Sequence, residues 1–251
     1  DYRTLLGQGV VARFDPETYS DAVAFARIGE GSLGGKARGL AFMNSMILKH
    51  RLYDKHANVR IMIPRSVVIA TDYFDDFIRL NGLKYIISQE FSDEEILSEF
   101  VSSTVPAKLQ QELKAYIQTV RTPLAVRSSS KLEDSHYQPF AGIYSTYMIP
   151  YVDNGDQMLR LLLKAVKSVY ASVYFATSRA YLSSSQNLIS EEKMAVIIQE
   201  VCGTEQDGLF FPTFSGVARS INYYPIGDEA PADGVCNIAM GLGKRVVDGG
   251  R

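Results

Sequence analysis

The sequence predicts an α+β fold, in which strands and amphipathic helices follow one another along the chain. Two runs rich in β-branched residues are typical of strands, 59–70 and 193–201, and the second is expected to be central and buried on both faces. A long helix is predicted to begin at Asp153-Asn154, because apolar residues then recur at helical spacing. The segment 72–121 shows this spacing in shorter pieces and is expected to be mostly helical.

The composition is that of a globular protein without a strongly charged surface. The 251 residues are 46% hydrophobic, which is enough for one large or two small domains with a core. The net charge of −2 argues against binding to nucleic acid or to an anionic membrane. Cys202 and Cys236 make no dense disulfide framework and are expected to be reduced, buried thiols in the cytoplasm. No apolar run reaches transmembrane length, and no signal peptide is visible.

The stretch 124–142 is the part of the sequence that points most directly to a ligand. Residues 124–126 predict a short strand, and Arg127 is expected at its end. Three serines and the acidic pair Glu133-Asp134 follow, and a small-residue turn ending at Gly142 leads into a second β-rich run. A guanidinium among hydroxyls and backbone amides suits a polyphosphate, since arginine offers a planar fork of donors. An Arg–Asp pair that pins a serine-rich turn is the alternative without a ligand.

A second candidate, Lys36, follows a glycine-rich loop. The apolar residues beyond it have helical spacing, so Gly34-Gly35-Lys36 is expected near a helix N-terminus. Backbone amides and the positive end of the helix dipole attract phosphate there, and the lysine adds a point charge. A glycine helix start with a solvated lysine is the alternative.

Two common nucleotide motifs explain this loop poorly. The glycines at positions 29, 31 and 34 satisfy G-x-G-x-x-G, but that fingerprint requires a preceding strand and an acid about 20 positions on. Residues 21–27 look at least as helical as extended, and the best acid nearby, Asp54, lies beyond a basic helix end. A P-loop is excluded, because its first glycine is out of register and Ala37 stands where Ser or Thr is required.

The remaining features predict a scaffold. Ser92 and Glu95 have the spacing of a capping box, and Pro106 fits the first turn of another helix. The acidic cluster 93–95 is interpreted as a solvated first turn and not as a metal site. Gln199 lies inside the predicted central strand, where its side-chain amide needs a partner, for example across the sheet.

The ordered run Ala125-Val-Arg-Ser-Ser-Ser-x-x-Glu-Asp134, followed by Phe140-Ala-Gly142, resembles the N-terminal nucleotide-binding domain of the pyruvate phosphate dikinase and phosphoenolpyruvate synthase family. The resemblance extends over residues 28–250 and includes Gly34-Gly35-Lys36. It implies an ATP-grasp-like fold, C-terminally incomplete in this chain. The implied organisation is a connecting segment over 1–25 and a nucleotide-binding domain over 26–251, with a helical part over 72–121 and a phosphate-binding stretch over 124–149.

The resemblance also implies a site for ATP and Mg²⁺. Lys36 and Arg127 would act on the phosphates, and Gly142 and Thr146 would contact them through backbone or hydroxyl groups. Gln199 and the Val201 backbone would lie beside the adenine. The ligands of Mg²⁺ are expected outside this chain. The family usually has Glu where this chain has Lys244, a charge reversal beside the expected phosphate site.

By the same resemblance, the full-length protein is a cytoplasmic, ATP-dependent phosphotransferase. It would pass the β-phosphoryl group of ATP to a carrier histidine on another domain of the same polypeptide and then to pyruvate. A homodimer is the assembly that the resemblance suggests. Two alternatives stay open: a related dikinase with a glucan or an antibiotic as acceptor, and a nucleotide-sensing module without catalysis.

The chain itself is expected to be a fragment, because both ends look cut. His50, His56 and His136 match no carrier-histidine motif: the first two are expected at a helix end and the third in a loop. The chain alone is therefore expected to fold but not to catalyse phosphoryl transfer.

Overall fold

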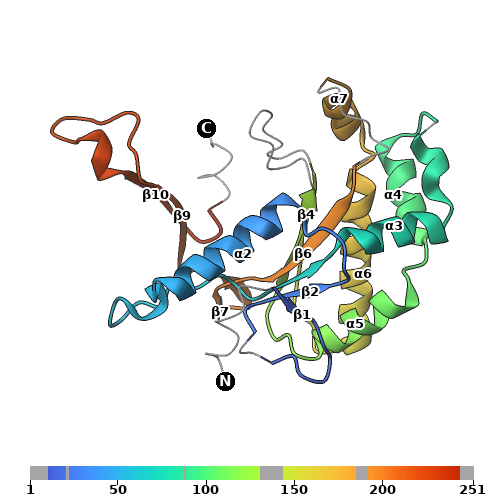
Figure 1. The fold of residues 1–251 in the computed structure, drawn as a ribbon, viewed down its shortest axis with the longest axis horizontal. Helices are drawn as coiled ribbons and strands as arrows, with labels where there is room; N and C mark the ends of the chain where they lie inside the picture. Colours follow the sequence, from blue (N-terminus) through green and yellow to red (C-terminus); the bar gives the residue numbers. More distant parts are fainter. Residues whose placement is uncertain (1–10, 21–22, 88, 131–143, 185–191, 244–251) are drawn as a thin grey trace. The chain divides into compact units, whose positions relative to one another are not determined.

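The structure is a computed structural model that describes residues 11–20, 23–87, 89–130, 144–184 and 192–243 (Figure 1). The chain divides into two compact units, Asp1–Glu200 and Val201–Arg251, which are described separately. The strands of the first unit are β1 (Ala12–Arg13), β2 (Phe25–Ile28), β3 (Ser66–Ile69), β4 (Leu124–Ser130), β5 (Thr146–Ile149) and β6 (Met194–Glu200). Its α-helices are α2 (Gly34–Lys49), α3 (Thr71–Leu80), α4 (Asp93–Ser102), α5 (Ala107–Ile117), α6 (Gly155–Ser172) and α7 (Ala176–Ser184). Two 3-10 turns are η1 (Leu52–Asp54) and η2 (Leu83–Ile87).

The strands of the first unit form a six-stranded mixed sheet in the order β1-β2-β3-β6-β4-β5. β1, β2 and β3 are parallel neighbours, whereas β6 runs antiparallel to both β3 and β4, and β5 runs antiparallel to β4. β6 is central, and all of its residues except the last are buried, as its β-branched sequence predicts. The mixture of helices and strands is consistent with the predicted α+β class.

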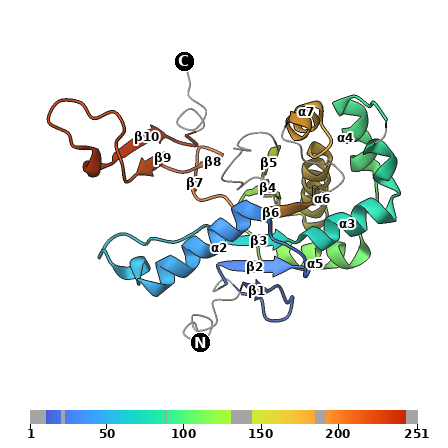
Figure 2. The ribbon, with the colours of Figure 1, turned by 45° about the horizontal axis from the view of Figure 1, so that its top comes forward.

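Helices cover the two faces of this sheet unequally (Figure 2). One face packs against α3 to α6 in the large core cluster, which takes in Val126, Val196 and Ile198 from the central strands. The other face packs against α2 in a smaller cluster around Val68 and Ile197. Thr146 is exposed and Met148 is 52% exposed, which shows that α2 does not cover the β4–β5 edge of the sheet.

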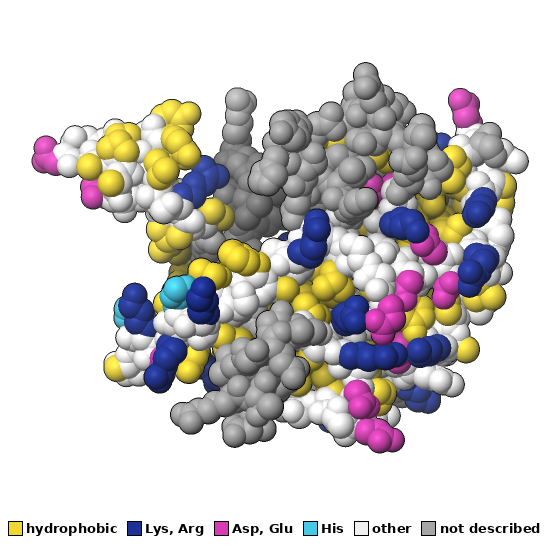
Figure 3. All heavy atoms as spheres, viewed as in Figure 1, with side chains coloured by type: hydrophobic (Ala, Val, Ile, Leu, Met, Phe, Trp, Pro, Cys, Tyr) yellow, Lys and Arg dark blue, Asp and Glu magenta, His cyan; other side chains and the backbone are white. Residues whose placement is uncertain are grey.

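The side of α2 that points away from the sheet is itself exposed. Phe42 is 65% and Met43 49% exposed, and hydrophobic side chains are visible along this helix in Figure 3. Basic side chains and histidines gather at its C-terminal end, where Lys49, His50 and Lys55 are exposed. The expected surface position of His50 at a helix end is confirmed.

The helical segments begin where the sequence predicts. The Ser92 hydroxyl accepts the amide of Glu95 at 3.2 Å, while the Glu95 carboxylate accepts the Ser92 amide at 2.8 Å, which confirms the capping box of α4. The Asn154 side chain accepts the amide of Gln157 at 2.9 Å and caps α6. Among the described residues, no helix is both long and apolar enough to cross a membrane.

One local prediction for the first unit, the position of Arg127 at a strand end, is wrong. β4 extends to Ser130, so Arg127 lies in mid-strand, with β5 on one side and β6 on the other. Backbone pairing of Ser128, Ser129 and Ser130 with β6 overrides their turn preference. Residues 25–28 form strand β2, so the extended interpretation, which the sequence left open beside a helical one, holds for these residues. Within 1–25, expected as a connecting segment, β1 pairs with β2, and Phe14 is buried.

The second unit consists of two antiparallel hairpins. β7 (Thr204–Gln206) pairs with β8 (Leu209–Phe211), and β9 (Phe214–Arg219) pairs with β10 (Val235–Met240), with the 3-10 turn η4 (Pro231–Asp233) before β10. Cys202 and Cys236 are both exposed, so the prediction of buried thiols is wrong. Lys244 lies outside the described residues.

Candidate functional site

The N-terminus of α2 lies directly against strand β4. The Ala37 amide donates to the Ser129 hydroxyl at 3.0 Å, and this hydroxyl donates to the carbonyl of Leu33 at 2.8 Å. Gly34 has a φ of +72°, and a Cβ on it would lie 1.8 Å from the Ser129 carbonyl oxygen. Glycine is needed there, since any side chain would push α2 away from β4. This contact fixes the start of α2 beside the serines that follow Arg127.

Lys36 lies in the first turn of α2, as the glycine-rich loop predicts. Its Nζ donates to the Ser128 hydroxyl at 3.3 Å. Ser128 follows Arg127 in β4, so Lys36 lies near the strand that carries Arg127, although the Ser128 side chain projects to the opposite face of the sheet from Arg127. The helix N-terminus adds the positive end of a dipole to the lysine charge.

Arg127 and Gln199 are in direct contact. A guanidinium nitrogen of Arg127 donates to Oε1 of Gln199 at 3.1 Å, and Nε2 of Gln199 donates to the Ser66 hydroxyl at 3.2 Å. Gln199 is only 8% exposed, so these two contacts provide the cross-sheet partners that its buried amide requires. Within the described part of the chain, no carboxylate pairs with Arg127. Among the described residues its charge is hydrogen-bonded but not neutralised, and the acidic pair Glu133-Asp134 lies outside them.

The strand register places Thr146 on the same face as Arg127. Arg127 is opposite Thr146 on β5 and opposite Ile197 on β6. Directly opposite residues of antiparallel strands project to one face, and Ile197 belongs to the cluster under α2. Arg127, Thr146 and Gln199 therefore share the face of the sheet on which α2 packs. Together with Lys36 they are called the candidate site below.

The other two residues assigned to ATP are not placed in this site. Gly142 lies outside the described residues. Val201 follows β6 directly and is the first residue of the second unit. Among the described residues, no group of three or more His, Cys, Asp or Glu side chains is arranged to hold a metal ion.

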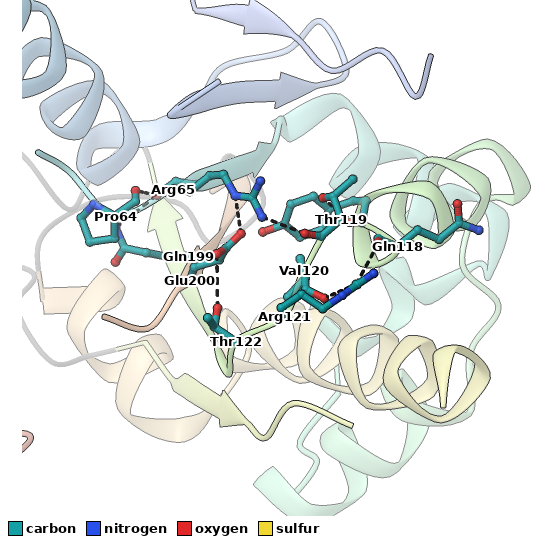
Figure 4. A network of polar contacts seen from close by, with 11 residues as sticks. Pro64, Arg65, Gln118, Thr119, Val120, Arg121, Thr122, Gln199 and Glu200 are labelled. Atoms are coloured by element: carbon teal, nitrogen blue, oxygen red, sulfur yellow. Dashed lines mark hydrogen bonds and ion pairs between the residues drawn. The ribbon is translucent and has the colours of Figure 1, made fainter. Parts of the chain in front are cut away.

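A largely buried ion pair beside Gln199, between Arg65 and Glu200, was not predicted from the sequence (Figure 4). The Glu200 carboxylate accepts from Nε of Arg65 through one oxygen and from the Thr122 hydroxyl at 3.2 Å through the other. Arg65 also donates to the Thr119 carbonyl at 3.0 Å, and the two charged side chains are 13% and 16% exposed. These bonds tie the end of β6 to the segments that enter β3 and β4. Because Gln199 directly precedes Glu200 in β6, these bonds also fix the position of Gln199. The sequence signal that could have predicted the ion pair was an acidic residue at the end of a buried strand.

Comparisons with known proteins show the family to which the chain belongs. The sequence profile of the family described as "Pyruvate phosphate dikinase, AMP/ATP-binding domain" matches residues 30–251. The chain is 28% identical over 193 residues to the "Uncharacterized phosphotransferase YvkC" of Bacillus subtilis, covering 76% of this chain and 20% of that protein. It is 26% identical over 214 residues to the "Probable phosphoenolpyruvate synthase" of Staphylothermus marinus, covering 75% of this chain and 23% of that protein.

A third relative is the "Phosphoenolpyruvate synthase" of Aeropyrum pernix, which is 24% identical over 200 residues, covering 71% of this chain and 22% of that protein. The chain thus spans about a fifth of the length of the curated relatives that it matches. The family profile covers nearly all of the chain, including the loop before Lys36 and the strand that carries Arg127. The chain therefore belongs to the pyruvate phosphate dikinase AMP/ATP-binding domain family.

Proposed function

We propose that the candidate site binds ATP, with the phosphates at Lys36 and Arg127 and the base toward Gln199. The observation that carries the proposal is the state of Arg127. It is a half-buried cation on a partly exposed sheet face, and its partner among the described residues is a neutral amide. A buried carboxylate would satisfy the guanidinium internally, whereas an amide leaves its charge available to an anion.

The two cations would serve different purposes at the phosphates. Arg127 is held in mid-strand and by Gln199, so its planar fork would hold two phosphate oxygens in a fixed orientation. Lys36 is a point charge on a flexible stem at the start of α2, and it would follow the phosphates as charge develops on them. When bound, Mg²⁺ would supply further charge neutralisation between the phosphates. The residues described here would bind and orient the nucleotide.

We further propose that the domain has an ATP-grasp-like arrangement and works within a longer phosphotransferase. The phosphoryl group would pass from ATP to a carrier histidine on another domain and then to pyruvate. The family match and the two relatives named as phosphoenolpyruvate synthases support this route. In that reaction this domain would provide positioning and charge neutralisation, which account for most of the catalysis of phosphoryl transfer.

Calorimetric titration with ATP and with adenosine tests the binding mode. Lys36→Met should weaken ATP binding about tenfold or more, the scale of one charge-assisted hydrogen bond, and leave adenosine binding unchanged. Lys49→Met is a matched control, because Lys49 is exposed at the opposite end of the same helix. Equal ATP affinity in the wild type and Lys36→Met would contradict the proposal, as would an equal loss of adenosine binding.

A further inference from the structure

The glycine-rich loop before α2 closes around a carboxylate of the protein itself. Oδ2 of Asp72 accepts the Glu30 amide at 2.9 Å, and Oδ1 accepts the Gly31 amide at 3.0 Å. The Thr71 hydroxyl accepts the next amide, that of Ser32, at 3.0 Å. Successive backbone amides form a cradle for an anion, and here Asp72 and Thr71 occupy that cradle.

The glycines of the loop are explained by this contact. A Cβ on Gly29 would lie 2.5 Å from the Asp72 carboxylate, and a Cβ on Gly31 would lie 2.6 Å from the Asp72 amide nitrogen. Side chains at these two positions would separate the loop from the start of α3. Together with the contact of Gly34 on β4, protein packing accounts for all three glycines of G-x-G-x-x-G.

The same contacts distinguish this loop from the phosphate-binding loop of a dinucleotide fold. β2 precedes the loop, and β2 and β3 are adjacent and parallel, so the strand that the fingerprint requires is present. The reason for rejecting that motif is therefore not a missing strand. A phosphate bound at the Glu30 and Gly31 amides would have to displace the Asp72 carboxylate, which repels it.

We propose that Asp72 is a positioning residue for the phosphate site and acts through Lys36. Asp72 and Thr71 hold the loop from the side of α3, and Ser129 holds the start of α2 from the side of β4. The Gly34 amide also donates to the Ser32 hydroxyl at 3.2 Å, which continues the connection into α2. Lys36, in the first turn, is thereby set against Ser128, and the filled cradle directs phosphate toward Lys36 and Arg127. Asp72 has this role only if ATP binds as proposed above, so the inference depends on the proposed function.

The test is a double-mutant cycle on ATP affinity, measured by calorimetry with folding checked by circular dichroism. Asp72→Asn replaces one of the two acceptors with a donor, and it should weaken ATP binding about five- to tenfold, the scale of one or two hydrogen bonds. Adenosine binding should not change. In the Lys36→Met background the same substitution should cause no further loss, because Asp72 acts through Lys36. Asp76→Asn, at a 44%-exposed position on the same helix, is the control for the lost charge.

Thr71→Val removes only the acceptor of the Ser32 amide and should give a smaller loss with the same pattern. If Asp72→Asn does not fold, Thr71→Val is the variant that tests whether the loop contacts position Lys36. Unchanged ATP affinity in the folded variant, a parallel loss of adenosine, or full additivity with Lys36→Met would each overturn the role of Asp72. If Lys36→Met itself leaves ATP binding unchanged, the proposed phosphate site fails, and this result is distinct from a failure at Asp72 alone.

Discussion

The guanidinium of Arg127 donates to the side-chain oxygen of Gln199 at 3.1 Å, between the neighbouring strands β4 and β6. Gln199 passes the connection to Ser66 on β3 at 3.2 Å, so one amide links three strands of the sheet. The amide orients the guanidinium without cancelling its charge. In the proposed site, this neutral partner would leave Arg127 free to bind an anion.

Arg127→Met should weaken ATP binding by about 1.5–3 kcal/mol, or roughly ten- to a hundredfold, because a charge-assisted contact to phosphate is lost. The fold should persist, since methionine keeps the aliphatic stem within β4. Calorimetry gives the affinity and thermal unfolding the stability. Arg60→Met, at an exposed position, is the control and should change neither. ATP affinity that is equal in Arg127→Met and the wild type would return Arg127 to a purely structural role.

Gln199→Glu should weaken ATP binding while leaving the protein folded. The substitution keeps the shape of the side chain but places a carboxylate against Arg127, which then satisfies the guanidinium internally. ATP affinity should fall about tenfold, the loss expected for one charged hydrogen bond, and its dependence on salt should become shallower. Titrations at two ionic strengths measure both effects. Stronger ATP binding in Gln199→Glu would show that Arg127 does not face the phosphates.

The Arg65–Glu200 pair should be coupled energetically. Each single substitution, Arg65→Met or Glu200→Gln, breaks a largely buried ion pair and leaves the other partner with fewer bonds. A double-mutant cycle by urea unfolding should give a coupling energy of about 1–3 kcal/mol. The exposed pair Arg79–Asp76, whose side chains are 78% and 44% exposed, should give a much smaller coupling and is the comparison. Equal coupling in the two pairs would contradict the anchoring role of Glu200.

Much of the fold could be predicted from the sequence where period and capping signals agree. The buried strand β6, the capping box of α4 and the Asn154 cap of α6 each combine a local signal with a matching hydrophobic pattern. The start of α2 at Gly34 was also predicted locally, from the glycines before Lys36 and the helical spacing of the apolar residues after it. Lys36, Arg127 and Gln199 were named from the sequence, and the structure places Lys36 near β4 and Arg127 against Gln199.

The parts that could not be predicted depend on contacts between distant segments. The serines after Arg127 have the local preferences of a turn, yet β6 supplies backbone partners as far as Ser130 and keeps β4 extended. Asp72 has the ordinary position of an acid in a first helical turn, and only the folded chain brings it under the amides of Glu30 and Gly31. Exposure of Cys202 and Cys236 likewise follows from tertiary structure and not from residue type.

Hydrogen–deuterium exchange with and without ATP tests most directly where the nucleotide binds, because it needs no substitution. ATP should slow exchange in peptides that cover two segments. The first is the start of α2, residues 33–40, whose backbone amides have no neighbouring strand, and the second is the edge strand β5, residues 146–149, whose one neighbouring strand is β4. Peptides that contain Tyr85, Phe91 and Glu99, which line a separate hollow, should exchange at the same rate with and without ATP. Unchanged exchange at residues 33–40 and 146–149, with protection by ATP elsewhere in the chain, would contradict the placement of the phosphates at Lys36 and Arg127.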